Sequence, residues 1–149
     1  GSLSIVAPER AFSPPPYREP VDVTLGSLAT LVGFDLRPAQ PRAGDELAVT
    51  LIWRAEGTAT ESYHVFLHLL DAQGRLVAQS DGVPVEWRRP TTGWLAGEYL
   101  VDRHALVIPA DSAGEAVLLA GMYLPDGARL TTPDGADVLP LTRIPLGDG

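Results

Sequence analysis

The chain has 149 residues, a formal net charge of −8, a pI near 4.7 and no cysteine. This length is typical of one domain, and 45% hydrophobic with 20% charged residues is typical of a globular one. The acidic balance argues against nucleic-acid binding, which needs a basic face to displace counterions from phosphates. The missing cysteines exclude disulfides, thiolate zinc sites and cysteine nucleophiles.

The beginning of the chain reads as a linker. It opens Gly1-Ser2 and holds its single methionine at Met122, which is typical of a cloned fragment. Several prolines follow, and these fix φ and withhold backbone donors. We therefore expect a tag remnant and proline-rich linker over residues 1–20, and a single β-sandwich domain over residues 21–149. No apolar run approaches the roughly 20 residues of a membrane span, so we expect no membrane insertion.

Short β-branched and leucine-rich runs, each ended by turn residues, follow from Val21 onward. This pattern predicts an all-β fold, an antiparallel two-sheet β-sandwich of immunoglobulin-like or jelly-roll-like type, with a small barrel as the alternative. In chain order, the predicted strands lie within residues 21–38, 46–55, 62–71, 71–81, 98–109, 115–124, 128–132 and 137–146.

Three details of these runs place them in the sheets. The run 62–71 is apolar on both faces, which indicates a strand in the middle of a sheet. The last run, 137–146, contains prolines that cannot donate to a ladder, so it predicts an edge strand. Gly33 interrupts the first run and marks a bulge.

The three histidines give no metal or cofactor site. His64 and His68 share a strand face but lie about 13 Å apart at strand rise, too far to chelate one ion. His68 and His104 could meet across strands, with Asp102 on the same face as His104. No serine occupies a strand-to-helix elbow, and the acidic residues fall mostly in turns. We predict that the fragment is not an enzyme. A deep pocket that holds at least two of His68, Asp102 and His104 would indicate the opposite.

The stretch "WRRPTTGWLAGEY" is the candidate binding region. Trp87 can stack on a pyranose ring while Arg88, Arg89 and Glu86 supply hydrogen bonds to hydroxyls. Packing into the core is an equally good interpretation of Trp87, and the better one for Trp94. We assign structural roles to four residues, Trp94, Trp53, Asp102 and His68.

Three segments, residues 32–55, 63–85 and 91–109 followed by 121–130, together carry a family resemblance. They resemble the C-terminal β-sandwich module that follows the transmembrane helices in bacterial, Chloroflexi-like membrane glycosyltransferases of the protein O-mannosyltransferase superfamily. The family's W-x-x-G-E pattern matches Trp94 to Glu98 and precedes a strand aspartate, here Asp102, and its V-F-x-H-L-x-D pattern matches Val65 to Asp71. The resemblance implies that these residues build the module, and that catalysis belongs to another part of the parent protein.

Two functions remain open. The first is a non-catalytic module on the extracytoplasmic face of a membrane glycosyltransferase or envelope protein, with glycan, acceptor or the parent's transmembrane part as its partner. The second is a structural or protein-interaction module of immunoglobulin-like type that binds no sugar. A large exposed apolar patch away from Trp87 would favour the second function.

Overall fold

The computed structural model describes residues 10–147. Eight strands occur in this range, and the one helix found there is a short 3₁₀ turn, η1. In chain order the elements are β1 (Glu19–Leu25), β2 (Ala29–Arg37), β3 (Glu46–Ala55), β4 (His64–Leu70), β5 (Leu76–Gly82), η1 (Thr91–Gly93), β6 (Tyr99–Val107), β7 (Glu115–Tyr123) and β8 (Leu139–Pro145).

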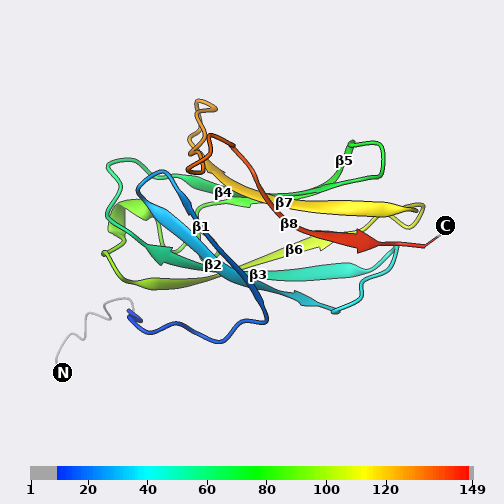
Figure 1. The fold of residues 1–149 in the computed structure, drawn as a ribbon, viewed down its shortest axis with the longest axis horizontal. Coiled ribbons are helices and arrows are strands. Elements are labelled where there is room, and N and C mark those ends of the chain that lie inside the picture. The colour runs from blue at the N-terminus through cyan, green and yellow to red at the C-terminus, as the bar shows by residue number, and fades with distance from the viewer. Residues whose placement is uncertain (1–9, 148–149) are drawn as a thin grey trace, which may run out of the picture.

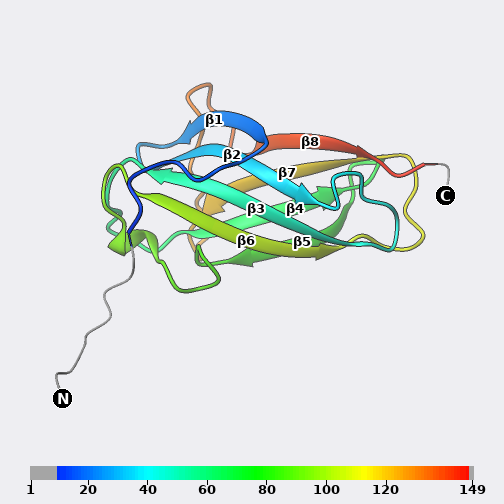
Figure 2. The same cartoon turned by 90° about the horizontal axis from the view of Figure 1, so that it is seen from below.

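The strands form two four-stranded antiparallel sheets, in the orders β1-β2-β3-β6 and β5-β4-β7-β8. The sheets face each other as two layers, and the connections β3–β4, β5–β6 and β6–β7 cross between them (Figure 1). The predicted two-sheet β-sandwich is therefore confirmed. Seen from below, β6 and β5 lie along one side of the sandwich and β1 and β8 along the other (Figure 2).

The first predicted run is two strands rather than one. A turn at Gly26 to Leu28 separates β1 from β2, and the two strands pair as a hairpin. The register of β2 against β3 shifts between Leu31 and Gly33, which confirms the predicted bulge. Because of this shift both Leu31 and Phe34 face the core, although they lie three positions apart and strict alternation would place them on opposite faces.

The positions of two strands agree with the sequence, and one predicted strand is wrong. β4 lies in the middle of its sheet and β8 lies at an edge. Residues 128–132 form no strand, and Arg129 makes a single bridge to Tyr123. The run pairs only with the end of β7, where the Leu124 amide donates to the Ala128 carbonyl and the Leu130 amide to the Met122 carbonyl, and a turn around Gly135 follows. The backbone carbonyl of Thr131 instead accepts a hydrogen bond from the Gly26 amide.

The core lies between the two sheets and is filled by the inward residues of every strand. Trp53 and Trp94 are its largest buried side chains. Around them pack leucine, isoleucine, valine and alanine side chains from both layers, among them Leu25, Leu31, Leu47, Leu51, Val65, Leu67, Leu69, Leu100, Leu118 and Ile144. This apolar packing is the main source of stability for a sandwich of this size.

The described part of the proline-rich segment lies against the sandwich. Ala11 forms an antiparallel bridge with Tyr99, and the guanidinium of Arg10 donates to the Glu98 carboxylate. β1 begins at Glu19, two residues before the predicted domain boundary. The division of the chain at residue 20 stays a prediction, and residues 1–9 lie outside the described range.

Candidate functional site

A row of rings covers the outer face of the sheet β5-β4-β7-β8. Alternation along β4 turns Val65, Leu67 and Leu69 inward, so the even-numbered residues His64, Phe66 and His68 point outward. The ring centroids of Phe66 and His68 are 4.7 Å apart, and the Tyr123 ring of β7 lies 5.4 Å from His64 and 6.1 Å from Phe66. Two neighbouring strands thus carry one continuous group of rings on this side of the sheet, which we call the aromatic face (His64, Phe66, His68, Tyr123); Phe66 is its buried member, at 1% exposure, and the other three are partly exposed.

A glycine allows Phe66 to lie on the sheet. Gly121 is directly opposite Phe66 in the β4–β7 register, and a Cβ atom at Gly121 would collide with the Phe66 ring. The ring is therefore packed against backbone, where a larger residue on β7 would lift it outward. On its other side the Arg129 guanidinium lies 4.5 Å from the ring centroid, within cation–π range.

A shallow depression of about 290 Å³ opens on the aromatic face. Its lining combines rings with groups that form hydrogen bonds: Phe66, His68, Gln79, Asp81, Tyr123, Gly127 and Arg129. The Tyr123 hydroxyl donates to Asp81 Oδ2 at 3.0 Å, and His68 Nε2 lies 4.0 Å from Asp81 Oδ1. An apolar floor with a few polar groups at its rim is the usual composition of a small-molecule site.

Burial changes the protonation equilibria of two groups in this depression. Desolvation lowers the pKa of His68 below its ordinary value, against the opposing effect of the Asp81 carboxylate, and the Arg129 charge lowers it further. Desolvation and the hydrogen bond to Asp81 raise the pKa of Tyr123. At neutral pH the depression therefore presents a neutral imidazole and a neutral phenol, both able to donate and accept hydrogen bonds.

Trp87 extends the aromatic face beyond the edge of the sheet. Its ring meets His64 edge to face, with centroids 5.2 Å apart and planes at 79°. A Cβ atom on Gly82 would stand 2.7 Å from the indole Nε1 atom, so the indole lies across the end of β5. The residue is nevertheless 62% exposed. A large ring with one packed edge and one open face is available for stacking.

The loop that carries Trp87 has an unusual backbone. Val85, Glu86 and Trp87 have φ values of 58°, 55° and 69°, three consecutive non-glycine residues in the left-handed region. This region costs roughly 1–2 kcal/mol per residue, and it is least favourable for a β-branched side chain such as Val85. Backbone bonds from the Trp87 amide to the Val83 carbonyl and from the Arg89 amide to the Pro84 carbonyl close the turn.

A buried carboxylate holds the start of this turn. Asp102, on the inner face of β6, accepts hydrogen bonds from the Val85 amide at 2.8 Å, from Trp53 Nε1 at 3.2 Å and from His104 Nε2 at 2.8 Å. His104 Nδ1 in turn lies 2.8 Å from the Ser80 hydroxyl of β5. The four side chains form a polar bridge between β5 and β6, at the side of the sandwich where the two sheets meet.

This serine, histidine and aspartate chain is not an open catalytic site. Asp102 and His104 are buried, and neither lines any of the four main cavities found in residues 10–147. His68 and His104, which the sequence left free to meet across strands, do not meet, because His68 points to the outer face of its sheet while His104 points between the sheets. Asp102 and His104 do share a face, as the alternation of β6 requires.

The structure divides the four residues predicted to bind ligand. Trp87, Glu86 and Arg88 lie on the exposed turn, with the Arg88 guanidinium 3.4 Å from the Glu86 carboxylate. Arg89 is only 15% exposed and points inward to form an ion pair with Glu98. Trp94 is fully buried and donates from Nε1 to the Arg89 carbonyl. A binding role for the exposed three stays a prediction.

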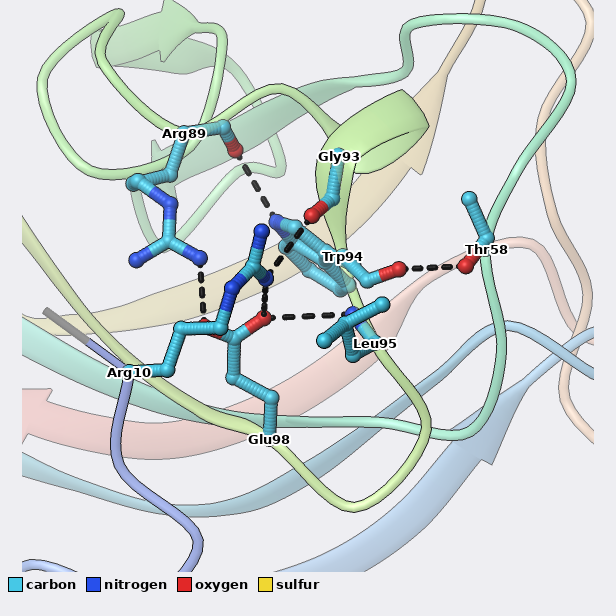
Figure 3. A network of polar contacts seen from close by, with 7 residues as sticks. All are labelled: Arg10, Thr58, Arg89, Gly93, Trp94, Leu95 and Glu98. Carbon is cyan, nitrogen blue, oxygen red and sulfur yellow. Dashed lines mark hydrogen bonds and ion pairs between the residues drawn. The ribbon is translucent and has the colours of Figure 1, made fainter. Parts of the chain in front are cut away.

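Glu98 connects the loop to the rest of the sandwich (Figure 3). Its carboxylate is fully buried and lies between the guanidinium groups of Arg10 and Arg89, with a distance of 2.8 Å to Arg10 Nη1. The same carboxylate accepts the Leu95 amide at 3.2 Å. Two arginines and a backbone amide therefore satisfy a charge that would otherwise be costly to bury.

A second contact fixes the backbone of Trp94. The hydroxyl of Thr58 donates to the Trp94 carbonyl, and the Arg10 guanidinium donates to the Gly93 carbonyl at 2.9 Å (Figure 3). Three segments that are distant in sequence thus meet around η1. The Trp94 end of the loop is held from several sides, while the Trp87 end projects outward.

Sequence reasoning did not identify most of the aromatic face. His64 was recognised as sharing a face with His68, but the partners from other strands were not predicted: Gln79, Asp81, Tyr123 and Arg129. Strand alternation indicated only that His64 and His68 share one side of β4. The pairing of β4 with β5 and β7, which brings them together, depends on topology.

Metal sites and membrane-spanning helices are both absent from the described residues. Between residues 10 and 147, no three histidine, aspartate or glutamate side chains lie in an arrangement that could hold a metal ion. The same range contains no helix with the length and apolar character needed to span a bilayer.

The fold and the aromatic face together define a β-sandwich module with a shallow, ring-lined depression on one sheet. No family model matches the chain, and neither does any curated protein. Among solved structures, the chain is similar to the C-terminal domain of wzt, with a TM-score of 0.53 and 13% sequence identity over 93% of this chain and 74% of that one. A likeness at this identity shows the fold, a β-sandwich.

Proposed function

We propose that the chain is a non-catalytic saccharide-binding module, and that the ligand stacks on Trp87 and the adjoining aromatic face. The observation that carries this proposal is the continuous series of rings from Trp87 through His64 to Tyr123, which ends at the ring-lined depression. An open indole beside partly exposed rings suits a sugar ring, whose C–H face is apolar and whose edge carries hydroxyls. Trp87 is the exposed ring of the series, at 62%, while the Phe66 ring is 1% exposed and lies beneath its neighbours.

The polar groups around the rings match the edges of a sugar. Asp81 and Gln79 offer acceptors and an amide, and Arg129 offers guanidinium donors at the rim of the depression. Glu86 and Arg88 extend the same polar fringe beside Trp87. Arg89 takes a different part in the proposal, since its ion pair with Glu98 positions the turn and leaves ligand contact to its neighbours.

The wider setting of the module is part of the same proposal. The ordered segments that resemble the soluble region of membrane glycosyltransferases support a module appended to such an enzyme or to a related envelope protein, on the extracytoplasmic face of the membrane. Within that setting the module would position a glycan or acceptor near the enzyme, while catalysis belongs to the parent. The full-length gene product tests this setting: transmembrane helices encoded before Leu3 would support it, and a chain without them would overturn it.

Titration of the chain with cell-wall and storage glycans tests the binding itself. We expect weak, saturable changes in tryptophan fluorescence and in the amide resonances of Tyr123 and Trp87 at millimolar sugar. Trp87→Ala should weaken binding about tenfold or more, because an aromatic residue on which the ligand stacks carries a large share of binding energy.

The matched control is Phe12→Ala, which also removes an exposed ring, at a position 57% exposed and outside the aromatic face. This variant should bind as the native chain does. Absence of any spectral change at about 10 mM of every glycan would contradict saccharide binding. Equal losses for Trp87→Ala and Phe12→Ala would also contradict the proposed location.

A protein-interaction module is the second candidate. Phe12 and Leu95 are both exposed apolar side chains, and Gly97, two residues after Leu95, lies beside the Phe12 ring. Exposed apolar side chains other than Trp87 are the feature expected of an interaction module. Co-purification of a protein partner that is lost with Phe12→Ala and retained with Trp87→Ala would favour this function.

A further inference from the structure

A separate cavity of about 510 Å³ opens on the side of the sandwich where β1 and β8 lie. This side is opposite the β5 and β6 strands, as the view from below shows (Figure 2). The cavity, which we call the arginine cleft, is lined by residues of β1, β2, β8 and the loop after β2: Arg18, Glu19, Phe34, Leu36, Ala39, Gln40, Pro41, Arg42, Thr142, Arg143, Ile144 and Pro145.

The cleft reaches the core of the sandwich. Phe34 and Ile144 are almost completely buried and belong to the main hydrophobic cluster, yet both line the cleft. Leu36 of β2 lies beside them and is half-buried. A ligand that enters here would therefore meet apolar side chains at the bottom of the cleft and polar ones at its mouth, as is usual for a small-molecule pocket.

The residues that line the cleft carry a net positive charge, opposite in sign to the net charge of the chain. Three of its lining residues are arginines, Arg18, Arg42 and Arg143, and one is acidic, Glu19. Arg143 forms an exposed ion pair with Glu115 at 2.9 Å. Within residues 10–147, no ion pair involves the guanidinium group of Arg18 or of Arg42. Two carboxylates outside the lining lie close to these arginines, since Asp35 accepts the Arg18 amide and Asp45 accepts the Arg42 amide, each at 2.8 Å. The excess of positive charge is therefore confined to the residues that line the cleft.

We infer that the arginine cleft is a second ligand site, for a compact molecule that carries a carboxylate or phosphate group on a partly apolar body. Guanidinium groups bind either oxyanion through paired N–H donors, and a positive cleft concentrates anions near an acidic protein. The apolar body would lie against Phe34, Leu36 and Ile144. This inference is independent of the aromatic face, since the two sites share no residue.

Three sugars with the same ring distinguish the sources of the oxyanion: glucose, glucuronate and glucose 6-phosphate. Each is titrated into the chain while amide resonances are recorded. We expect glucuronate or glucose 6-phosphate, and not glucose, to shift the amides of Phe34, Leu36 and Ile144 in a saturable way. The shifts should weaken as salt is added, because exposed charges are screened. Any binding of glucose at the aromatic face would shift Tyr123 instead, so the two proposals can fail separately.

Variants then test the arginines. Arg18→Ala and Arg42→Ala should each weaken oxyanion binding about tenfold, because each removes a charged hydrogen-bonding partner. Arg18→Lys and Arg42→Lys keep the charge without the paired donors, and each should weaken binding less than the alanine change. Arg103→Ala is the matched control: Arg103 is an exposed arginine of β6, outside the cleft, and its loss changes the net charge equally.

Three results would overturn the inference. The first is no shift of the Phe34, Leu36 and Ile144 amides with either oxyanion up to about 20 mM. The second is an equal response to glucose, which would show that the oxyanion is not recognised. The third is an equal loss of binding in the Arg103→Ala, Arg18→Ala and Arg42→Ala variants, which would show a general charge effect and no localised site.

Discussion

The two tryptophans of the loop between β5 and β6 show how differently one short segment can use the same side chain. Trp94 is fully buried, and both its indole nitrogen and its backbone carbonyl form hydrogen bonds within the chain. Trp87 is 62% exposed and meets the protein along one edge, against His64 and Gly82. Trp94 is part of the core, while most of the Trp87 ring is exposed to solvent.

The difference between these two ends of the loop has a physical basis. Glu98 and Asp102 are buried carboxylates whose partners hold the inner side of the loop. That support is what permits the left-handed backbone at Val85 to Trp87, since such a turn persists only where surrounding contacts over-determine it. The rigid inner side therefore determines where the exposed indole stands. Changes to the inner side should lower stability, and changes to the outer side should leave it nearly constant.

The largest expected effect is that of Trp94→Ala. Removing a fully buried indole from the core should lower the free energy of unfolding by about 3–5 kcal/mol, because the lost contacts and the remaining cavity both cost stability. Urea unfolding followed by circular dichroism measures this change. Trp87→Ala is the control and should change the same quantity by less than about 1 kcal/mol. Equal losses in the two variants would break the contrast between them.

Glu98→Gln should have the next largest effect. The substitution keeps the shape of the side chain but leaves Arg89, which is largely buried, without the carboxylate that it pairs with. Breaking a buried ion pair on one side costs about 3 kcal/mol. Glu86→Gln makes the same chemical change at an exposed position, where the effect should stay within about 0.5 kcal/mol. Unfolding free energies that are indistinguishable between these variants would show that the Glu98 network contributes little.

Asp102→Asn should have a smaller effect on global stability and a specific effect on the turn. Asparagine offers one acceptor oxygen where aspartate offers two, so the bonds from Val85, Trp53 and His104 cannot all be kept. We expect a loss of about 2 kcal/mol and faster hydrogen exchange at the Val85 amide.

The control for this prediction is Asp111→Asn, at an exposed aspartate in the β6–β7 connection. It should change neither the stability nor the exchange rate at Val85. If the Val85 amide exchanges equally slowly in native protein and in Asp102→Asn, the carboxylate does not hold the turn.

The two-sheet architecture could be predicted from the sequence, but the grouping of side chains on the outer faces of the sheets could not. A run that is apolar on both faces identified β4 as central, and proline placement identified β8 as an edge strand, because each property depends on one strand alone. The run at residues 128–132 is not a full strand, because its pairing with β7 is limited to one bridge and two backbone hydrogen bonds before the turn around Gly135 begins. The residue pattern of a short segment does not show how many of its residues will pair with a neighbouring strand.

The candidate site could be predicted only in part, because its residues come from several segments of the chain. Trp87 stood out as an aromatic residue among turn residues, and it lies at one end of the aromatic face. Tyr123, Asp81 and Arg129 come from three other segments, and only the pairing of β4 with β5 and β7 brings them beside it. Arg89 and Arg88 are adjacent in sequence but differ in direction: the Arg88 guanidinium lies near the exposed Glu86, and the Arg89 guanidinium pairs with the buried Glu98.

His68 provides the smallest effect and tests the outer face alone. Its pKa is lowered mainly by burial, so the folded state binds a proton less readily than the unfolded state does. The group therefore costs no stability above its ordinary pKa of 6.5, and stability is lost as pH falls from there through the folded pKa. Asp81, which faces the imidazole, opposes this loss, while Arg129 adds to it. His68→Gln should thus reduce the fall in unfolding free energy between about pH 7.5 and about pH 5. If native protein and variant lose equal stability over that interval, His68 titrates as a solvated histidine, and the outer face is more open to water than the packing of Phe66, His68 and Arg129 indicates.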